Sequence, residues 1–368
     1  AHARLAIIDL IGGGQPMIKR LGDQPAAIVY NGELYNTEEV RKDLLHLGYS
    51  FETSSDTEVL LNAYLAFGPD FVKRLNGIFA FAILDSRKRQ IMLCRDRAGV
   101  KPLFYTRQGG ELIFASEIKG IFAHPEVVPQ LKKEGLQEIF SIGPARIPGS
   151  GVFDGIKEVL PGHYLIADAS GMRDCCYWKL ESRPHKDSLE ETIEKTSFLI
   201  QDSIRRQMVS DVPICTFLSG GIDSSVVSAI CAGELKKKGK QLHTFSFDFT
   251  ENDKYFQSSA YQPSQDRPFA EMMVKRCGTN HHFLECDNTL LADYLSPAVR
   301  ARDLPCMADV EASMLYFCRQ VVQYDKVALT GECADEIFGG YPWFHREELV
   351  TKHGFPWSNE FSMRTAML

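Results

Sequence analysis

The first half of the chain alternates short apolar runs with polar turns, a pattern typical of β-strands. Strands are expected in five segments rich in Ile, Val, Phe and Tyr: 26–30, 77–85, 90–95, 101–106 and 111–115. Residues 85–88 separate two of these strands as a hairpin loop would. Helices are predicted from Thr37, with Gly48 just past the end, and over residues 56–67. Helices set among antiparallel-looking strands indicate an α+β fold.

The pattern changes after a seam at residues 169–190, where Gly, Pro, His and charged residues replace the apolar runs. Apolar residues then recur at helical spacing between Leu189 and Met208. Beyond them the order becomes strand, glycine-rich turn, helix and strand, and helical stretches continue to alternate with strands. The strand–helix–strand unit spans 212–218, 224–235 and 241–247, and the later strands are expected at 281–285 and 326–330. This alternation predicts an α/β domain with a doubly wound parallel sheet.

Composition narrows the class of protein. The chain has 368 residues, 44% of them apolar, which is enough for two hydrophobic cores. The net charge of −7 is spread without a concentrated block of one sign, so neither nucleic acid nor a membrane surface is expected as a partner. No apolar stretch approaches the roughly 18 residues of a membrane span, and no signal peptide is visible. The 10 cysteines include no CxxC pair and are expected to be reduced thiols of a cytoplasmic protein.

The most specific motif is Ser219-Gly220-Gly221-Ile222-Asp223-Ser224-Ser225, between a predicted strand and a predicted helix. Glycines and a helix N-terminus offer phosphate oxygens close backbone N–H donors, to which the serine hydroxyls can add. Phosphate would repel the carboxylate of Asp223 unless Mg²⁺ bridged the two. A Walker A motif, which would indicate γ-phosphate cleavage, is absent from the sequence.

This motif resembles the pyrophosphate-binding loop of the ATP pyrophosphatases. A second string, Gly331-Glu332-Cys333-Ala334-Asp335-Glu336, resembles one in asparagine synthetases. The resemblance implies that Gly331 and Thr330 lie against ATP, that Glu332 supports an adenylate intermediate and that Asp335 assists Mg²⁺. It also implies that Leu218 and Phe247 flank the adenine, although both could equally be strand core.

The first half resembles the class II glutamine amidotransferase domain. Six strings match in family order: 4–9, 15–17, 31–36, 55–58, 95–103 and 116–119. We expect the string 95–103 to have a structural role near the domain interface, because the chemistry demands no single residue in it.

Hydrolysis of the glutamine amide passes through an oxyanion, which two convergent donors stabilise. We interpret the Asn31 side chain and the Gly32 backbone N–H as this pair, although an isolated Asn-Gly is more often a hairpin turn. A guanidinium suits the α-carboxylate of glutamine, hence Arg4, and a carboxylate suits its ammonium, hence Asp56. The resemblance adds further glutamine-binding residues: Leu5, Ala6, Ile7, Ile8 and Glu33.

The nucleophile of the family is a cysteine at the mature N-terminus, whose own amine acts as base. Ala1 is not that cysteine, and Cys94, the first cysteine, lies in a predicted strand. We therefore expect a sequence truncated at both ends. The expected domains are a glutaminase over 1–170 with the αββα sandwich of N-terminal nucleophile enzymes, a linker over 171–188, and an ATP-pyrophosphatase domain over 189–368.

The resemblance implies a glutamine-hydrolysing asparagine synthetase. Its substrates would be glutamine, aspartate and ATP, with Mg²⁺, and family members are often homodimers. Two alternatives stay open. One is a related amide ligase acting on another acid, because residues 306–311 lack the Thr- and Arg-containing string of the better-known branch. The other is a non-catalytic remnant that binds ATP or a partner protein.

Overall fold

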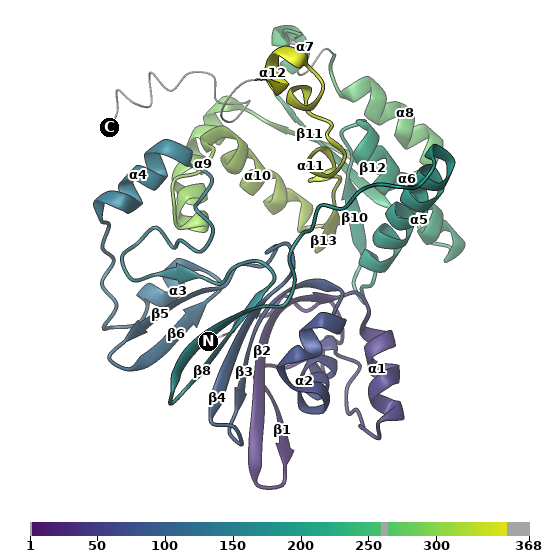
Figure 1. Ribbon diagram of the computed structural model, residues 1–368. Helices are drawn as coiled ribbons and strands as arrows, with labels where there is room; N and C mark the ends of the chain where they lie inside the picture. Colours follow the sequence, from purple (N-terminus) through teal and green to yellow (C-terminus); the bar gives the residue numbers. More distant parts are fainter. Residues whose placement is uncertain (1, 259–263, 352–368) are drawn as a thin grey trace. The chain divides into compact units, whose positions relative to one another are not determined.

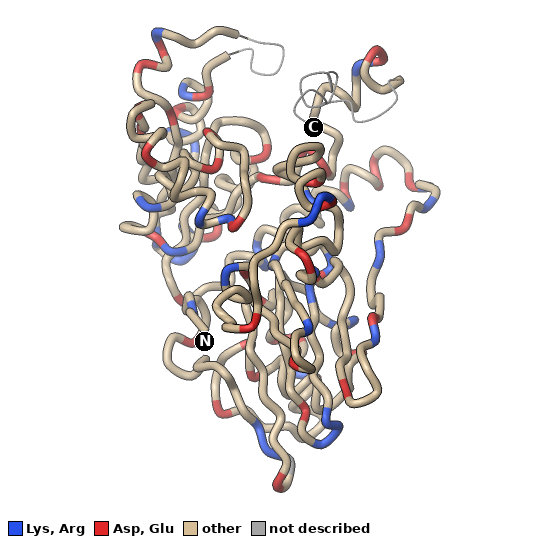
Figure 2. The backbone as a smooth tube through the Cα atoms, turned by 90° about the vertical axis from the view of Figure 1, so that its left-hand side faces the viewer, with Lys and Arg blue, Asp and Glu red and all other residues tan. Residues whose placement is uncertain are grey.

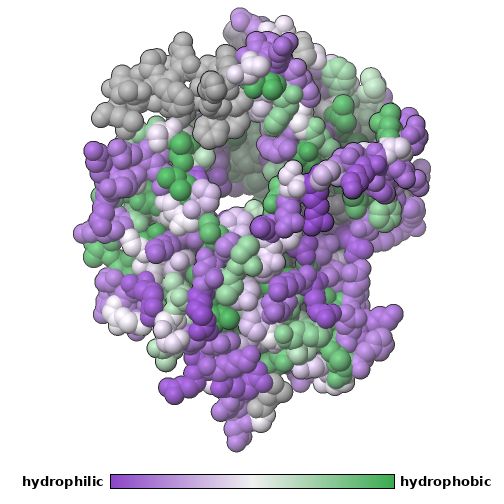
Figure 3. All heavy atoms as spheres, viewed as in Figure 1, coloured by the Kyte–Doolittle hydropathy of each residue, from purple (hydrophilic) through white to green (hydrophobic). Residues whose placement is uncertain are grey.

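The computed structural model describes residues 2–258 and 264–351, and the chain divides into two compact units, Ala1–Lys186 and Asp187–Leu368 (Figure 1). Each unit has its own sheet and its own hydrophobic core. Lys, Arg, Asp and Glu are scattered along the whole backbone in Figure 2. On the face seen in Figure 3, hydrophilic residues are interspersed with apolar ones. No described helix is long and apolar enough to span a bilayer.

The first unit is built on a six-stranded antiparallel sheet in the order β1-β2-β3-β4-β8-β9. Its strands are β1 (Met17–Leu21), β2 (Gln24–Leu34), β3 (Gly77–Asp85), β4 (Gln90–Arg95), β8 (His163–Asp168) and β9 (Gly171–Cys176). A three-stranded sheet in the order β6-β5-β7 accompanies it. This smaller sheet consists of β5 (Phe104–Gln108), β6 (Glu111–Ala115) and β7 (Lys157–Glu158).

Both faces of the larger sheet are covered. On one face, Phe79, Phe81 and Ile83 pack in a core with the helices α1 (Thr37–His46) and α2 (Asp56–Phe67). On the other face, Ala80 and Ala82 pack with residues of the smaller sheet. Because both sets of alternating side chains are buried, β3 has a continuous apolar sequence rather than an alternating one. The remaining helices of this unit are η1 (Gly68–Arg74), α3 (Ile118–Phe122) and α4 (Lys133–Ile142).

The second unit contains a parallel four-stranded sheet in the order β12-β11-β10-β13, which confirms the parallel α/β prediction. Its strands are β10 (Ile214–Phe217), β11 (His243–Phe249), β12 (Asn280–Cys286) and β13 (Val327–Leu329). Apolar residues of α5 (Leu189–Gln207) and α6 (Ile222–Lys237) pack in one core cluster of the sheet. Val321 of α10 (Ala308–Val321) packs with Cys215 and Phe245 in a separate core cluster. The other helices are α7 (Asn252–Tyr255), α8 (Arg267–Cys277), α9 (Asn288–Arg302), α11 (Ala334–Phe338), η2 (Pro342–Phe344) and α12 (Glu347–Val350).

The structure corrects two details of the sequence-based reading and excludes one alternative. Residues 171–176 form the strand β9 rather than a linker, because an edge strand with exposed side chains carries no apolar run. The strand expected at 101–106 begins only at Phe104, after a loop. The pair Asn31-Gly32 lies inside β2, opposite Ala80 and Phe79, so it is not a hairpin turn.

Gly32 is required by close packing of β2 on β3. A Cβ atom at this position would lie 2.2 Å from the carbonyl oxygen of Ile78 and 2.7 Å from the Cα of Phe79. We predict that Gly32→Ala lowers the free energy of unfolding of the first unit by roughly 2 kcal/mol, because backbone atoms cannot move aside as a flexible side chain can. Gly14→Ala is the matched control, because no atom lies within 4 Å of its added Cβ. Chemical denaturation of both variants tests this, and equal stabilities would contradict it.

Candidate functional site

The first unit contains a cavity of about 130 Å³ next to β2 and the start of α2. Eight of the nine residues expected to bind glutamine line it, and Ala6 does not. They are Arg4, Leu5, Ile7, Ile8, Asn31, Gly32, Glu33 and Asp56. The structure thus brings together three segments that are far apart in the sequence. It adds residues that sequence reasoning did not select: His2, Ala3, Gln15, Tyr30, Thr57 and Lys101.

Arg4 holds the loop that follows it. Its Nη2 atom donates to the carbonyl oxygens of Ile8 at 2.7 Å and Asp9 at 2.9 Å, and its Nη1 donates to that of Leu10 at 3.5 Å. The guanidinium lies so close to Gly13 that a Cβ there would be 2.1 Å from Nη2. Arg4 therefore shapes the wall of the cavity that Ile7 and Ile8 also line.

Asp56 is a buried acid at the first position of α2. Its Oδ2 accepts hydrogen bonds from the Tyr30 hydroxyl at 2.9 Å and from the backbone N–H of Leu34 at 3.2 Å. Burial raises the pKa of the Asp56 carboxyl, and these hydrogen bonds and the charge of Arg4 oppose that rise. A ligand ammonium would favour the ionised form further, so the site suits a cationic amine.

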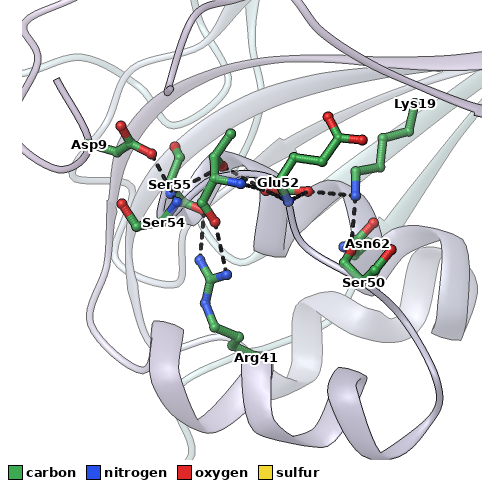
Figure 4. A network of polar contacts seen from close by, with 10 residues as sticks. Asp9, Lys19, Arg41, Ser50, Glu52, Ser54, Ser55 and Asn62 are labelled. Atoms are coloured by element: carbon green, nitrogen blue, oxygen red, sulfur yellow. Dashed lines mark hydrogen bonds and ion pairs between the residues drawn. The ribbon is translucent and has the colours of Figure 1, made fainter. Parts of the chain in front are cut away.

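A polar network fixes the loop before α2 (Figure 4). Arg41 donates to the carbonyl oxygens of Thr53 and Ser55, and Asp9 accepts from the N–H of Ser54 at 2.9 Å. The buried Glu58 accepts from the N–H groups of residues 52 and 53 and pairs with Lys19 at 2.6 Å. The loop is thus held from both sides, and it positions Asp56 in the cavity wall.

The string 95–103 forms a braced loop, as its expected structural role requires. The buried carboxylate of Asp96 accepts from the N–H groups of Phe79, Ala98, Val100 and Lys101. Arg95 donates to the carbonyl oxygens of residues 99, 101 and 159 and pairs with Glu158 at 3.1 Å. This bracing places Lys101 in the wall of the cavity.

The 10 cysteines all lie within the described residues, and none of them lines this cavity. Cys94 is fully buried in the core beneath α2, where burial raises the pKa of its thiol well above the usual range. A neutral, buried thiol cannot attack an amide in the cavity. Asn31 lines the cavity and is exposed, and its side-chain amide donates to Ser116 Oγ at 3.5 Å.

The second unit contains a larger cavity of about 710 Å³ at the carboxyl ends of the parallel strands. This is the edge where parallel α/β sheets bind their ligands. Of the ten residues expected to contact ATP, all but Gly220 and Ser225 line the cavity. The eight are Leu218, Ser219, Gly221, Asp223, Ser224, Phe247, Thr330 and Gly331. Glu332 and Asp335 also line it.

Glycines allow the two motifs to meet. A Cβ on Gly331 would lie 2.7 Å from the backbone nitrogen of Ser224, so the end of β13 touches the start of α6. Gly220 has φ of +92°, and a Cβ there would lie 2.5 Å from the nitrogen of Ala270 in α8. Gly220 therefore lets the loop pack closely against α8. The buried Oγ of Ser225 has no hydrogen-bond partner among the described residues.

The cavity is strongly acidic. Arg267 is the one basic residue in its described lining, and six carboxylates accompany it: Asp223, Asp248, Asp266, Glu332, Asp335 and Glu336. Burial, and then the charge of Asp335, raise the pKa of Asp223, so these two carboxylates face a common region. Such a surface would repel a polyphosphate unless a divalent cation were bound with it.

The residues present fit Mg²⁺. No cluster of three or more His, Cys, Asp or Glu side chains suited to a metal occurs in residues 2–258 and 264–351. Mg²⁺ commonly uses one or two carboxylates and takes its other ligands from phosphates and water. Asp223 and Asp335 meet that requirement, whereas a metal held by protein alone would need more side chains.

Aromatic rings form part of the wall of this cavity. The rings of Phe217 and Phe247 meet edge to face with centroids 4.8 Å apart, and Phe247 stacks on Phe317 at 4.4 Å. Phe247 thus contributes to the core and also lines the cavity. A role in the strand core and a place beside the adenine are therefore compatible for this residue. A planar apolar base would find contact area on this wall.

Comparison with known proteins defines the class. Residues 1–178 match the glutamine amidotransferase domain family, and residues 195–368 match the asparagine synthase family. The chain therefore joins two domains: residues 1–178 belong to the glutamine amidotransferase domain family, and residues 195–368 belong to the asparagine synthase domain family.

Three relatives illustrate this membership. Asparagine synthetase [glutamine-hydrolyzing] 3 of Bacillus subtilis is 50% identical over 368 residues, all of this chain and 60% of that protein. Asparagine synthetase [glutamine-hydrolyzing] 1 of the same organism is 33% identical, covering 95% of this chain and 52% of that protein. Amidase chyE of Penicillium rubens is 32% identical, and the match covers 97% of this chain and 53% of that protein. The chain thus spans between about half and 60% of these relatives' lengths.

The assignment of Asp223 as a ligand of Mg²⁺ can be tested by substitution. We predict that Asp223→Asn weakens binding of Mg-ATP about tenfold, because an amide is a poor ligand for Mg²⁺. Asp253→Asn is the matched control, because this exposed residue of α7 does not line the cavity. Titration calorimetry with ATP, with Mg²⁺ and again with a chelator, makes the comparison. Similar affinities for the two variants would contradict the assignment.

Proposed function

We propose that this chain carries the glutamine-hydrolysing and ATP-using parts of an asparagine synthetase, with glutamine, aspartate and ATP as its substrates. The observation that carries the proposal is the presence of two separate cavities, one in each unit. The first combines acidic and basic groups in about 130 Å³, which suits one amino acid. The second joins a phosphate-binding loop to carboxylates and an aromatic wall in about 710 Å³, which suits a nucleotide and a second substrate.

In the first unit, Asn31 and Gly32 stabilise the oxyanion that forms when the glutamine amide is attacked. Each such donor contributes on the order of 2.7–4 kcal/mol to the lowering of the barrier. Asp56 and Glu33 receive the ligand ammonium, whose charge compensates the buried carboxylate of Asp56. The layers of two sheets and flanking helices support an αββα sandwich of the N-terminal nucleophile type. The attacking thiol of that type is not among the residues that line the cavity.

In the second unit, the loop 219–225 and the N-terminus of α6 bind the β- and γ-phosphates, which leave as pyrophosphate. Asp223 and Asp335 would hold Mg²⁺, which would neutralise phosphate charge when bound. The aspartate side chain is adenylated at the α-phosphate, and ammonia then displaces AMP to give asparagine. Glu332, beside Gly331 in the cavity wall, lies where it can contact the reacting groups.

An amide ligase that acts on another carboxylic acid is the second candidate. Two observations favour keeping it: a relative of 32% identity is named an amidase, and residues 306–311 lack the expected acceptor string. A non-catalytic remnant is less well supported, because both cavities retain nearly all of their expected polar residues.

Adenylation of the acceptor can be measured without ammonia. We predict that the protein carrying this sequence exchanges labelled pyrophosphate into ATP when aspartate is present, because adenylation precedes ammonia attack and is reversible. Glu332→Ala should lower the exchange rate by about 100-fold, of the order found when one transition-state contact is removed. Glu347→Ala, in α12 and outside the cavity, is the control.

A panel of carboxylic acids separates the candidate functions. Exchange with another acid and none with aspartate would replace asparagine synthesis with the ligase alternative. ATP binding without exchange for any acid would favour the non-catalytic remnant.

A further inference from the structure

A buried hydrogen bond joins the strand before the loop 219–225 to the helix that follows it. The Oγ1 of Thr216 in β10 and the Oγ of Ser228 in α6 are 2.7 Å apart, and both residues are 0% exposed. Thr216 lies three residues before the loop, and Ser228 lies about two turns into the helix. Neither residue lines the cavity, so neither is expected to touch a ligand.

The surroundings of this hydroxyl pair are apolar. Ile214 lies on the same face of β10 as Thr216. It packs in one core cluster with Val227 and Cys231 of α6. Two hydroxyls that leave water gain little net free energy from each other, so an apolar pair of the same shape would serve this core as well. A hydrogen bond differs from an apolar contact in its preferred length and direction. The pair therefore fixes where α6 lies along β10.

The loop between them leaves α6 little room to move. The end of β10 is fixed to β11, because the Leu218 N–H donates to the carbonyl oxygen of Phe245 at 2.8 Å. The start of α6 lies against β13, where a Cβ on Gly331 would be 2.7 Å from the Ser224 nitrogen. Within the loop, the Oγ atoms of Ser219 and Ser224 are 3.0 Å apart. A small displacement of α6 along β10 would therefore either clash with β13 or separate these two serines.

We propose that Thr216 and Ser228 are positioning residues for the phosphate-binding loop. Their hydrogen bond keeps the groups at the end of β10 at a fixed spacing from those at the start of α6. The assignment rests on the proposed function, since it presumes that the loop holds the β- and γ-phosphates of ATP. Donors that are already in place bind phosphate oxygens more tightly, because no ordering of the loop is needed when the ligand arrives. The pair thus favours ligands that carry these two phosphates.

The test compares Mg-ATP with AMP, which keeps the adenine, the ribose and the α-phosphate but lacks the two phosphates assigned to the loop. Dissociation constants are measured by titration calorimetry on the protein carrying this sequence, with displacement titrations for the weaker ligand, for wild type and Thr216→Val. Valine keeps the shape of threonine and removes the hydroxyl. We expect the variant to bind Mg-ATP about fivefold or more weakly and AMP within about twofold of wild type, of the order that one lost hydrogen bond predicts.

Thr244→Val is the matched control. Thr244 lies beside Thr216 in the sheet and is also 0% exposed. Its Oγ1 lies 2.9 Å from that of Thr279 and 2.8 Å from His281 Nδ1, so its partners belong to β12 and the residue before it rather than to α6 or the loop. Chemical denaturation should show that Thr244→Val destabilises the chain at least as much as Thr216→Val does. Both ligands should nevertheless bind to it within about twofold of wild type, because the loop is unchanged.

A double-mutant cycle tests whether the hydrogen bond itself is responsible. Thr216→Val and Ser228→Ala each remove the same bond, and either single variant leaves one buried hydroxyl without its partner. We therefore expect the double variant to bind Mg-ATP no more weakly than either single variant.

Four results overturn the assignment. Two concern Thr216→Val alone: an unchanged affinity for Mg-ATP, or an equal loss for Mg-ATP and AMP. The others are a loss of Mg-ATP affinity in Thr244→Val as large as in Thr216→Val, and losses of the two single variants that add in the double variant. A wild-type chain that binds no Mg-ATP would instead overturn the proposed function, and this assignment with it.

Discussion

The two sites depend on one constraint: backbone approaches backbone at distances that leave no space for a side chain. In the first unit, Gly32 lets β2 lie against β3, where any Cβ would meet the carbonyl of Ile78 at 2.2 Å. In the second unit, Gly331 brings the end of β13 to within contact of Ser224, and Gly220 brings the phosphate loop against α8. Only glycine is compatible with such contacts, and each of them sets side chains from separate segments around one cavity.

In the first unit, buried carboxylates hold the loops that surround the cavity. Asp96 accepts four backbone N–H groups, and Glu58 accepts two along with an ion pair to Lys19. A buried charge is stable only when it is hydrogen-bonded in this way, so each acid fixes the loop that satisfies it. The loops then present Asp56 and Lys101 without being ordered by the ligand. The second cavity has a different character, since its described lining gathers six carboxylates around one basic residue, Arg267.

Much of the secondary structure and most of the cavity residues could be predicted from the sequence. The strands 77–85, 90–95 and 111–115 and the helix 56–67 were predicted with the bounds that the structure gives, because their apolar runs end at clear turns. Edge strands such as β9 were missed, since exposed side chains leave no apolar pattern. Motif chemistry found most residues of both cavities. It did not find Lys101, because nothing in the string 95–103 itself indicates that this residue lines the cavity.

The central claim is that glutamine binds in the first unit and Mg-ATP in the second, each through the loops that glycines bring together. Hydrogen exchange of backbone amides tests it directly, with each ligand added alone. Glutamine should slow exchange at residues 4–13, 31–34 and 56–57, and Mg-ATP should slow it at 218–225 and 330–336. Each ligand should leave the other set unchanged. Protection of one common set by both ligands, or of neither set, would contradict the account.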